Sequence, residues 1–359
     1  MGKVLMKGNE AIGEAAIRAG CLNYFAYPIT PQSEVAEYLS HRMPEVGGVF
    51  LQGESEVAVS YMIFGAAGCG ARVFTTSSSP GISLMGEGIS YIAGAQCPAV
   101  FVNIMRGGPG LGGILPSQAD YFQATKGGGH GDYRLLVMAP AGVQEAVEMV
   151  MLAFPLAEKY RNPVMILGDG LIGQMMEPVE FPDHLRSEPS NKDEWATNGM
   201  DTRKNDKPNI VKSLFLDPNE LNEHNLLLKS KYERMKREEV RYEPYNMDSD
   251  YKVLIVSYGT MSRVCRTAID NLKEEGFEVG MIRPQTLFPF PEEAIREAAS
   301  QDTCKAVISI EMSMGQMVED VERSVLGRRP VTWYGKCGGE VPTPEEIMDV
   351  VKSLEGPDR

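Results

Sequence analysis

The sequence predicts an α/β protein: a parallel sheet covered by helices on both faces, followed by a second, smaller α/β domain. Three observations lead to this prediction. Short apolar, β-rich runs alternate with helical stretches through the first half of the chain. The runs are continuously apolar, which indicates strands buried on both faces. The same alternation resumes at Tyr251, after a stretch rich in charge, proline and asparagine.

The first domain is expected over residues 1–180. Its helices include the apolar stretches at residues 55–70 and 143–160. Its expected strands end at residues where loops and helix N-termini would converge, the place where open parallel sheets bind ligands. The strand candidates are "GGVFLQG", "ARVFTTSS", "PAVFVNIMR", "YRLLVMAP" and "PVMILGDG".

Residues 181–250 are expected to form a charged connector packed on the surface, with one helix near residues 219–240. Residues 251–359 are expected to form the second domain. Its expected strands are "VLIVSYGT", "EVGMIRP", "AVISIEMS" and "VTWYGK", and its expected helices are "EEAIREAAS", "GQMVEDVERSVL" and "PEEIMDVVKSL".

The composition limits the class of protein. A net charge of −14 over 359 residues argues against nucleic acid or an anionic membrane as partner, and fits simple solubility or a basic partner subunit. No apolar run approaches the roughly 20 residues of a membrane span. The N-terminal residues lack the apolar core of a signal peptide, so a cytoplasmic location is expected.

The six cysteines are scattered and form no CxxC pair. A disulfide framework is therefore not expected in a chain of this size. An iron–sulfur or zinc site built from this chain alone is not expected either, because such sites usually take paired cysteines. Most of the six are expected to be small buried hydrophobic residues.

The stretch "AYPITPQSEVAEYL" places Thr30 at a stiff corner between Pro28 and Pro31, just before a helix that begins near Gln32 and Ser33. A hydroxyl held at a helix N-terminus suits an anionic group such as a carboxylate. The alternative is a helix cap with proline in the first turn.

Two further strand ends carry charge. Glu54 and Glu56 lie where a strand gives way to an apolar helix; they could complement the helix dipole, or one could point into the sheet cleft as a proton donor. Arg106 ends an apolar strand before a glycine-rich loop. It could grip a carboxylate or phosphate with two N–H groups, or pair with a local acid.

Two motifs are set aside. Gly108, Gly110 and Gly113 satisfy GxGxxG, but Pro109 interrupts the motif and no helix is expected directly after it, so dinucleotide binding is not predicted. The "GDG" at 168–170 resembles the start of a diphosphate–Mg²⁺ motif. Its partner asparagine would be Asn198, which falls in the polar connector, so no metal site is predicted in this chain.

Taken together, several segments resemble the α-type subunits of 2-oxoacid:ferredoxin oxidoreductases, and most closely the 2-oxoisovalerate (3-methyl-2-oxobutanoate) branch. The resemblance extends over almost the whole chain and is more specific for the family than for the substrate. The segments are "GNEAIGEAAIRAGCLNYFAYPITPQSE", "ESEVAV", "SPGISLMGEGISYIAGAQCPAVFVNIMRGGPGLGG", "KGGGHGDYR", "KSLFLDPNELNEHNLLLKSKYE", "RPQTLFPFP" and "GGEVPTPEEI".

The resemblance implies a thiamine-diphosphate pyrimidine-binding domain followed by a transketolase C-terminal-like domain. It implies that Thr30 and Arg106 hold the carboxylate of a 2-oxoacid. It also implies that Glu56, and not Glu54, hydrogen-bonds the aminopyrimidine ring of thiamine diphosphate and acts in catalysis. In this chain Ser79 stands where relatives usually have glycine, which puts the backbone conformation of its loop in doubt.

The resemblance also implies that the active site is shared between subunits. Thiamine diphosphate would be held jointly with a β-type subunit that binds the diphosphate and Mg²⁺. A γ-type subunit and a ferredoxin-like subunit with iron–sulfur clusters would complete the complex, coenzyme A would be co-substrate and ferredoxin the electron acceptor.

Three alternatives stay open. The first is the same reaction on another substrate, either 2-oxoglutarate or an aryl 2-oxoacid. The second is the β-type subunit of a lipoamide-linked 2-oxoacid dehydrogenase, which the corner at Thr30 and the presence of Arg106 disfavour. The third is a non-catalytic scaffold that only assembles partners, which the presence of Thr30, Glu56 and Arg106 disfavours.

Overall fold

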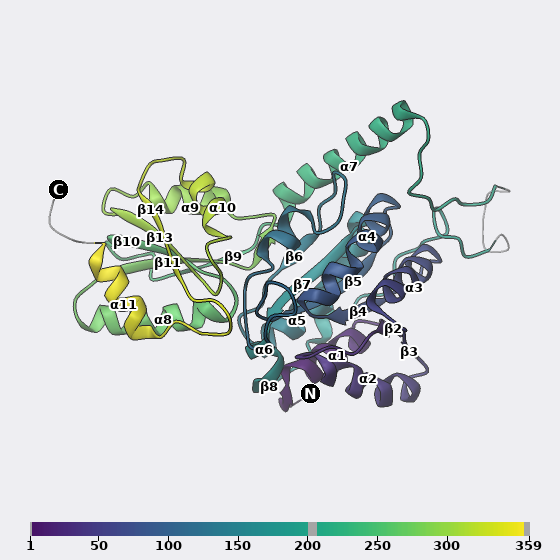
Figure 1. The fold of residues 1–359 in the computed structure, drawn as a ribbon, viewed down its shortest axis with the longest axis horizontal. Helices are drawn as coiled ribbons and strands as arrows, with labels where there is room; N and C mark the ends of the chain where they lie inside the picture. Colours follow the sequence, from purple (N-terminus) through teal and green to yellow (C-terminus); the bar gives the residue numbers. More distant parts are fainter. Residues whose placement is uncertain (1, 200–206, 355–359) are drawn as a thin grey trace.

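The computed structural model describes residues 2–199 and 207–354, which form two lobes side by side (Figure 1). The larger lobe is built on a seven-stranded sheet in the order β12-β6-β7-β5-β4-β2-β3. All neighbouring pairs in it are parallel except β12 with β6. The strands are β2 (Asn23–Ala26), β3 (Val49–Gln52), β4 (Phe74–Ser77), β5 (Ala99–Met105), β6 (Leu136–Met138), β7 (Pro163–Asp169) and β12 (Thr286–Phe288).

Helices cover both faces of this sheet, which confirms the predicted fold class. On one face α3 (Glu56–Gly68) and α4 (Ser79–Gly94) bury Ile63 and Met85 in a shared core. On the other face, a second core is built from α1, α2 and α5. These helices are α1 (Gly8–Arg18), α2 (Ser33–Glu45) and α5 (Val143–Tyr160), with the short α6 (Gly170–Gln174) and the two-stranded ribbon of β1 (Val4–Lys7) and β8 (Met176–Val179) beside them.

One strand departs from the prediction of burial on both faces. β3 is the outermost strand of the sheet and pairs only with β2. Its apolar residues are therefore left open, with Val49 48% and Leu51 47% exposed. The apolar run was typical of a buried strand, but strand order, which a single sequence does not reveal, puts it at the edge.

The connector contains the short 3₁₀ helix η2 (Asp183–Leu185) and the predicted long helix, α7 (Pro218–Glu238). The Asp217 side chain accepts a hydrogen bond from the Asn219 N–H and caps α7, and proline occupies its first turn. Leu228, Tyr232 and Met235 pack into the core of the larger lobe, so α7 runs along that lobe's upper side in Figure 1.

The smaller lobe is built on a five-stranded sheet in the order β14-β13-β10-β11-β9. One face is covered by α8 and α11 and the other by α9 and α10. The elements are β9 (Tyr242–Tyr245), β10 (Val253–Val256), α8 (Gly259–Glu274), β11 (Val279–Pro284), α9 (Glu292–Ala299), β13 (Ala306–Glu311), α10 (Val318–Val325), β14 (Val331–Gly335) and α11 (Pro344–Ser353).

The division at residues 180 and 250 stays a prediction, and two elements cross it. β9 comes from the connector and pairs antiparallel with β11 of the second sheet. β12 comes from the second domain and pairs with β6 of the first sheet. The two lobes thus share backbone pairing as well as side-chain contacts.

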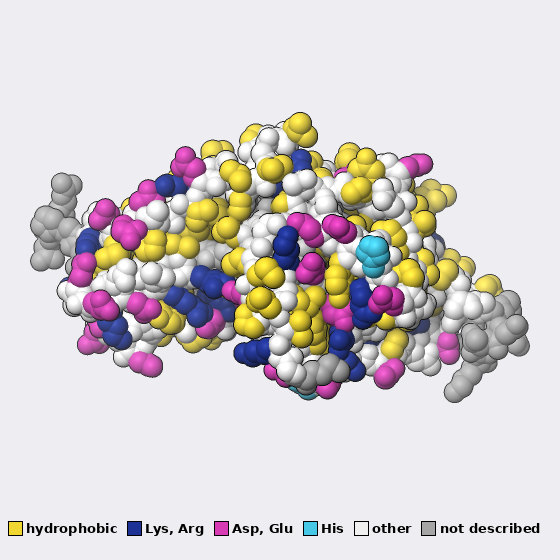
Figure 2. All heavy atoms as spheres, turned by 90° about the horizontal axis from the view of Figure 1, so that it is seen from below, with side chains coloured by type: hydrophobic (Ala, Val, Ile, Leu, Met, Phe, Trp, Pro, Cys, Tyr) yellow, Lys and Arg dark blue, Asp and Glu magenta, His cyan; other side chains and the backbone are white. Residues whose placement is uncertain are grey.

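The surface mixes charges of both signs. Acidic and basic side chains are interspersed with apolar ones on the face that Figure 2 shows. Four cysteines are buried and two, Cys69 and Cys337, are exposed, so most behave as the small buried residues expected. Over the described ranges, no helix is both long and apolar enough to cross a membrane.

Candidate active site at the carboxyl edge of the first sheet

Thr30, Glu56 and Arg106 all follow neighbouring strands at one edge of the first sheet. Thr30 follows β2, Glu56 follows β3 as the first residue of α3, and Arg106 follows β5 directly. Strands β5, β4, β2 and β3 are consecutive in the parallel part of the sheet. Their carboxyl ends therefore lie along the same edge, where ligands of such sheets bind.

Glu56 is buried but has no partner of its own. Its side chain is 6% exposed, whereas Glu54 is exposed. Ser55 caps α3 by accepting a hydrogen bond from the Ala58 N–H at 3.2 Å. Within residues 2–199 and 207–354, no side chain or backbone group hydrogen-bonds the Glu56 carboxylate. Buried carboxylates are normally hydrogen-bonded, so this one is set up for a donor from outside the chain.

The carboxylate of Glu56 lies against bare backbone at the start of α4. A Cβ at Gly81 would be 2.8 Å from Glu56 Oε1 and 2.2 Å from Ser77 Oγ, so this position must be glycine for both side chains to stay in place. The buried hydroxyls of Ser77 and Ser78, at the end of β4, also have no partner in the described structure. The unpaired Ser77 hydroxyl and the Glu56 carboxylate thus lie on the same side of Gly81.

Arg106 is 8% exposed, and its hydrogen-bond partners among the described residues are all neutral. Its Nη1 donates to the Thr30 carbonyl at 2.9 Å and its Nη2 to the Leu111 carbonyl at 3.4 Å, while Nε has no partner in the described structure. The alternative that Arg106 pairs with a local acid is therefore wrong. A buried guanidinium with spare N–H groups and no counter-ion suits an anionic ligand.

Thr30 does not cap a helix. Helix α2 begins at Ser33, and the residue at its N-cap position is Gln32, whose side chain makes no capping bond; the Thr30–Pro31 peptide is cis. The interpretation of this corner as a helix cap is wrong. The Thr30 carbonyl accepts a hydrogen bond from Arg106, and the Thr30 side chain is exposed at the same edge of the sheet.

Sequence reasoning missed a hydrogen-bonded cluster beside Arg106. Ser79 Oγ and Asn103 Nδ2 both donate to Asp120 Oδ2, at 2.6 and 2.9 Å. Burial raises the pKa of Asp120, and these two hydrogen bonds oppose the shift. Ser79 does not have the positive φ that would require glycine, so the doubt about its backbone is removed. An asparagine within the apolar run "AVFVNIM" was the available signal.

The two motifs set aside have other roles. Asp169 caps α6 by accepting from Leu171 N and Ile172 N, and it also accepts from the Thr260 hydroxyl. The loop after Arg106 turns back so that Pro116 forms a β-bridge with Arg106, and no helix follows the glycines directly. In the part of the chain that is described, no group of three or more His, Cys, Asp or Glu residues is arranged to hold a metal ion.

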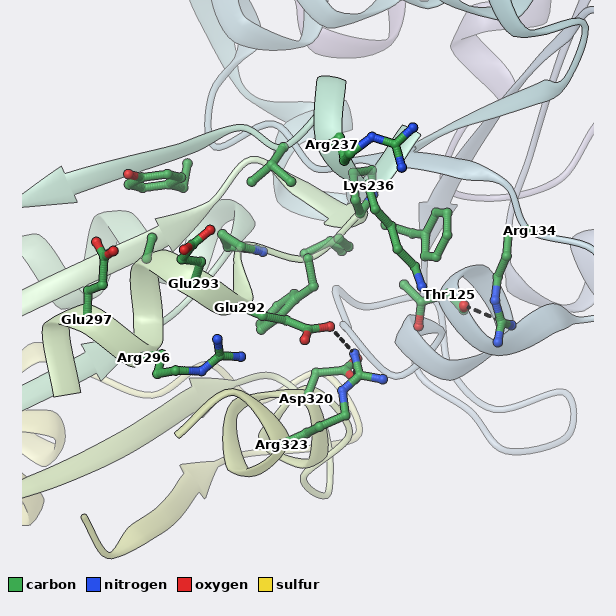
Figure 3. A pocket seen from close by; sticks show the side chains of 18 of the residues that line it. Thr125, Arg134, Lys236, Arg237, Glu292, Glu293, Arg296, Glu297, Asp320 and Arg323 are labelled. Carbon is green, nitrogen blue, oxygen red and sulfur yellow. Dashed lines mark hydrogen bonds and ion pairs between the residues drawn. The ribbon is translucent and has the colours of Figure 1, made fainter. Parts of the chain in front are cut away.

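A separate cavity of about 750 Å³ lies where α7, α9 and α10 meet (Figure 3). Its walls carry charges of both signs that pair with each other. Arg323 binds Glu292 at 2.6 Å, and Lys126 binds Asp320 at 2.5 Å. Thr30, Glu56 and Arg106 do not line it, so it is distinct from the candidate active site.

The similarity of this chain to known proteins identifies a thiamine-diphosphate-binding class of enzyme. Residues 14–243 match the family "Pyruvate flavodoxin/ferredoxin oxidoreductase, thiamine diP-bdg", and residues 252–347 match "Pyruvate:ferredoxin oxidoreductase core domain II". The chain belongs to the 2-oxoacid:ferredoxin oxidoreductases and is a subunit of such an enzyme, which confirms the resemblance noted in the sequence.

Among its relatives is the ketoisovalerate oxidoreductase subunit VorB of Methanothermobacter thermautotrophicus, 48% identical over 99% of both chains. The 2-oxoglutarate synthase subunit KorA of the same organism is 34% identical over 97% of this chain and 98% of its own. Both relatives are named as subunits of larger enzymes.

Solved structures agree with the fold. The 2-oxoglutarate:ferredoxin oxidoreductase of Magnetococcus marinus, with 2-oxoglutarate, coenzyme A and succinyl-CoA bound, is 28% identical with a TM-score of 0.87; the match covers 98% of this chain but only 65% of that one. A split-gene transketolase, as an inactive β4 tetramer, is 16% identical with a TM-score of 0.63 over 99% of each chain, and shows likeness of fold only.

The residues present fit the thiamine ring. The unpartnered Glu56 carboxylate can accept a hydrogen bond from, or share a proton with, a ring nitrogen, and Gly81 leaves the space beside it free of a side chain. The described residues offer no comparable group of acidic ligands for a metal bound to the diphosphate. The chain therefore fits the ring end of the cofactor.

Proposed function

We propose that this chain is one half of the active site of a ferredoxin-dependent oxidoreductase that converts a branched-chain 2-oxoacid and coenzyme A to acyl-CoA, CO₂ and reduced ferredoxin. The observation that carries the proposal is the Glu56 side chain, which is 6% exposed, has no hydrogen-bond partner in the described chain and lies at the same sheet edge as Arg106. Folding alone gives no reason to bury an unpaired carboxylate there.

Each residue has a role that its surroundings support. Bound thiamine diphosphate would supply an electron sink for the electron pair that stays on the former 2-oxo carbon when the carboxylate leaves as CO₂. Glu56 holds the aminopyrimidine ring and exchanges a proton with its nitrogen. Arg106 holds the substrate carboxylate through its free N–H groups. The Thr30 carbonyl accepts a hydrogen bond from Arg106 Nη1, and the Thr30 hydroxyl donates a further hydrogen bond to the substrate carboxylate.

The rest of the reaction needs partners. We assign the diphosphate and Mg²⁺ to a β-type subunit, the iron–sulfur clusters to a ferredoxin-like subunit, and a further γ-type subunit completes the complex. Exposed apolar side chains on the loop beside Arg106, Leu111 at 83% and Ile114 at 60%, suit contact with such a subunit. The cytoplasmic location stays a prediction from the sequence.

The substrate is assigned from two considerations. A relative that is 48% identical is named for ketoisovalerate. Of Thr30, Glu56 and Arg106, the three described side chains assigned to the site, only Arg106 is cationic, which suits an acid with one carboxylate better than 2-oxoglutarate with two. The charge of Arg106 is equally compatible with an aryl 2-oxoacid, which also has one carboxylate.

The test is CoA-dependent viologen reduction by the complex purified through this chain, with 2-oxoisovalerate, 2-oxoglutarate, pyruvate and phenylpyruvate in parallel. The highest kcat/KM is expected with 2-oxoisovalerate. A preference for another acid would change the proposed substrate but support the proposed reaction. No activity with any of the four, from an intact complex that contains thiamine and iron, would overturn the proposal in favour of a scaffold.

Glu56→Gln separates catalysis from assembly. Turnover is expected to fall by roughly 100-fold or more, because a positioned proton-transfer group contributes about 10²–10⁴ in rate, while the complex still assembles. Glu54→Gln is the matched control: the same substitution two residues away on an exposed side chain, expected to leave turnover unchanged. Equal turnover in the two variants would favour the scaffold.

A further inference from the structure

The loop that follows Arg106 is rich in glycine and is closed on itself by hydrogen bonds from the Gly107 N–H to the Leu115 carbonyl and from the Gly113 N–H to the Gly107 carbonyl. Its first seven residues, 107–113, include five glycines, with φ of 70° at Gly110 and 57° at Gly112. Glycine-rich backbone loses more conformational freedom on folding than other backbone. Its Leu111 carbonyl accepts from Arg106 Nη2, so the position of the guanidinium depends on the shape of the loop.

A single hydroxyl bridges the two ends of this segment. Ser79 Oγ accepts a hydrogen bond from the Arg106 backbone N–H at 3.0 Å, where the segment begins. It lies 2.6 Å from Asp120 Oδ2, where the segment ends, and 3.3 Å from the Arg106 carbonyl. A serine has one hydrogen to donate, and the shorter distance and the carboxylate charge assign it to Asp120.

Asn103 fixes the serine in turn. Its Oδ1 accepts from the Ser79 N–H at 3.1 Å, and its Nδ2 donates to Asp120 Oδ2 at 2.9 Å. Asn103 is fully buried in β5 and Ser79 is 9% exposed, whereas Asp120 is partly exposed, so water has only limited access to compete for these bonds. Strand β5, helix α4 and residue 120 are thereby tied together next to Arg106.

We propose that Ser79 and Asp120 are positioning residues for substrate binding: the Ser79 hydroxyl links Arg106 at one end of the glycine-rich segment 106–120 to Asp120 at the other, and so holds Arg106 where it binds the 2-oxoacid carboxylate. This inference rests on the proposed role of Arg106. Neither residue is assigned a contact with the substrate; they act through the backbone of Arg106 and through the loop that carries Leu111.

The experiment compares three variants of the purified complex: Ser79→Ala, Ser83→Ala and Arg106→Lys. Ser83 is the matched control, because its hydroxyl lies one turn along α4, donates to the Ser79 carbonyl at 3.2 Å and makes no bond to Arg106 or Asp120. Two readouts are taken: kcat and KM for 2-oxoisovalerate and for coenzyme A, and calorimetric binding of 2-hydroxy-3-methylbutanoate, which keeps the carboxylate and cannot react as a 2-oxoacid.

Ser79→Ala is expected to raise KM for the 2-oxoacid and weaken binding of the hydroxy acid roughly tenfold, the effect of losing one well-placed hydrogen bond. Its kcat and its KM for coenzyme A should not change, and Ser83→Ala should match the parent in all measurements. This pattern would support the positioning role.

Two results would overturn the inference and leave the proposed function standing. One is a raised KM in Arg106→Lys with normal binding in Ser79→Ala. The other is a fall in kcat and in thermal stability in Ser79→Ala with KM unchanged, since that is a merely structural effect. Normal KM and normal binding in Arg106→Lys would instead overturn the carboxylate role of Arg106, and the positioning role with it.

Discussion

Two buried glutamates at the ends of strands show how differently one side chain can be used. Glu311 ends β13 in the smaller lobe and is fully buried. It accepts from the hydroxyls of Ser309 and Ser313 and from three backbone N–H groups, with donor–acceptor distances of 2.6–3.1 Å. Glu56, after β3 in the larger lobe, is nearly as buried and has no partner in the described chain.

The difference separates structure from function. Glu311 accepts four hydrogen bonds from the loop 312–318 that leads into α10 and one from Ser309 in its own strand, so its acceptor capacity is used within the fold. The Glu56 carboxylate accepts no hydrogen bond in the described chain. A buried carboxylate without donors destabilises a fold unless a ligand or a partner chain supplies them. Burial alone therefore does not identify a catalytic acid, whereas burial without partners does favour one.

The largest loss of stability is expected for Glu311→Ala. Removing the acceptor leaves three backbone N–H groups and two hydroxyls without their shared partner, so the free energy of unfolding should fall by about 3–5 kcal/mol. Urea denaturation followed by circular dichroism measures it. A change below about 1 kcal/mol would mean that water replaces the Glu311 carboxylate as acceptor, and Glu311 would then not have the structural role that distinguishes it from Glu56.

Glu158→Gln tests a partnered carboxylate in the same lobe as Glu56. Burial alone would raise the pKa of Glu158, but hydrogen bonds from Arg72, Ser190 N and Lys192 lower it to about 2 from 4.5. Because the folded pKa is below the unfolded one, the stabilisation is fully present above pH 4.5 and is lost as pH falls towards 2.

The parent should therefore exceed Glu158→Gln in unfolding free energy by about 3 kcal/mol at pH 7, and the gap should close between pH 4.5 and 2. Urea denaturation at several pH values checks this. A gap that stays constant with pH would assign the effect to packing and not to charge.

Gly81→Ala should disturb the pocket around Glu56 directly. The new Cβ would lie 2.2 Å from Ser77 Oγ and 2.8 Å from Glu56 Oε1, so both must shift, with a loss of about 1–3 kcal/mol in stability and a marked loss of turnover.

Gly94→Ala, in the same helix, is the control for Gly81→Ala. Its Cβ would meet the nearest atom at 3.5 Å, and it should stabilise the chain by about 0.5–1 kcal/mol. Thermal unfolding and the viologen assay measure both variants. Full activity in Gly81→Ala would show that the position of Glu56 does not matter for turnover.

The smallest effect on stability is expected for Glu56→Gln, within about 1 kcal/mol of the parent, because no hydrogen bond in the described chain is lost. The same urea denaturation, run beside Glu311→Ala, gives the direct comparison. A loss as large as that of Glu311→Ala would show that Glu56 is held by the fold after all.

Much of the fold could be predicted from the sequence. The predicted helix at 143–160 matches α5 from Val143 to Tyr160, and the helix predicted at 219–240 matches α7 within two residues at each end. Local periodicity and burial decide such elements. The exposure of β3 and the pairing of β12 with β6 could not be predicted, because both depend on strand order. Helix α8 was absent from the predicted helices.

Only part of the site could be predicted from the sequence. The ends of apolar strands indicated Thr30, Glu56 and Arg106, but pattern alone did not decide between Glu54 and Glu56; the resemblance favoured Glu56, and the structure shows that it is the buried one. Asp120 and its bond to Ser79 join residues 41 positions apart. No local pattern connects them, since the contact exists only once α4 and the loop after β5 have met.

The pairing of β12 with β6 means that the chain cannot be cut cleanly between its lobes. A fragment ending at residue 250 would lack Thr286 and Phe288 and leave Val137 and Met138 at an open sheet edge. Unpaired strand edges recruit strands of other molecules. The larger lobe expressed alone would then be unsuitable for studying the proposed thiamine site, because its self-association would compete with binding of the proposed partner subunit.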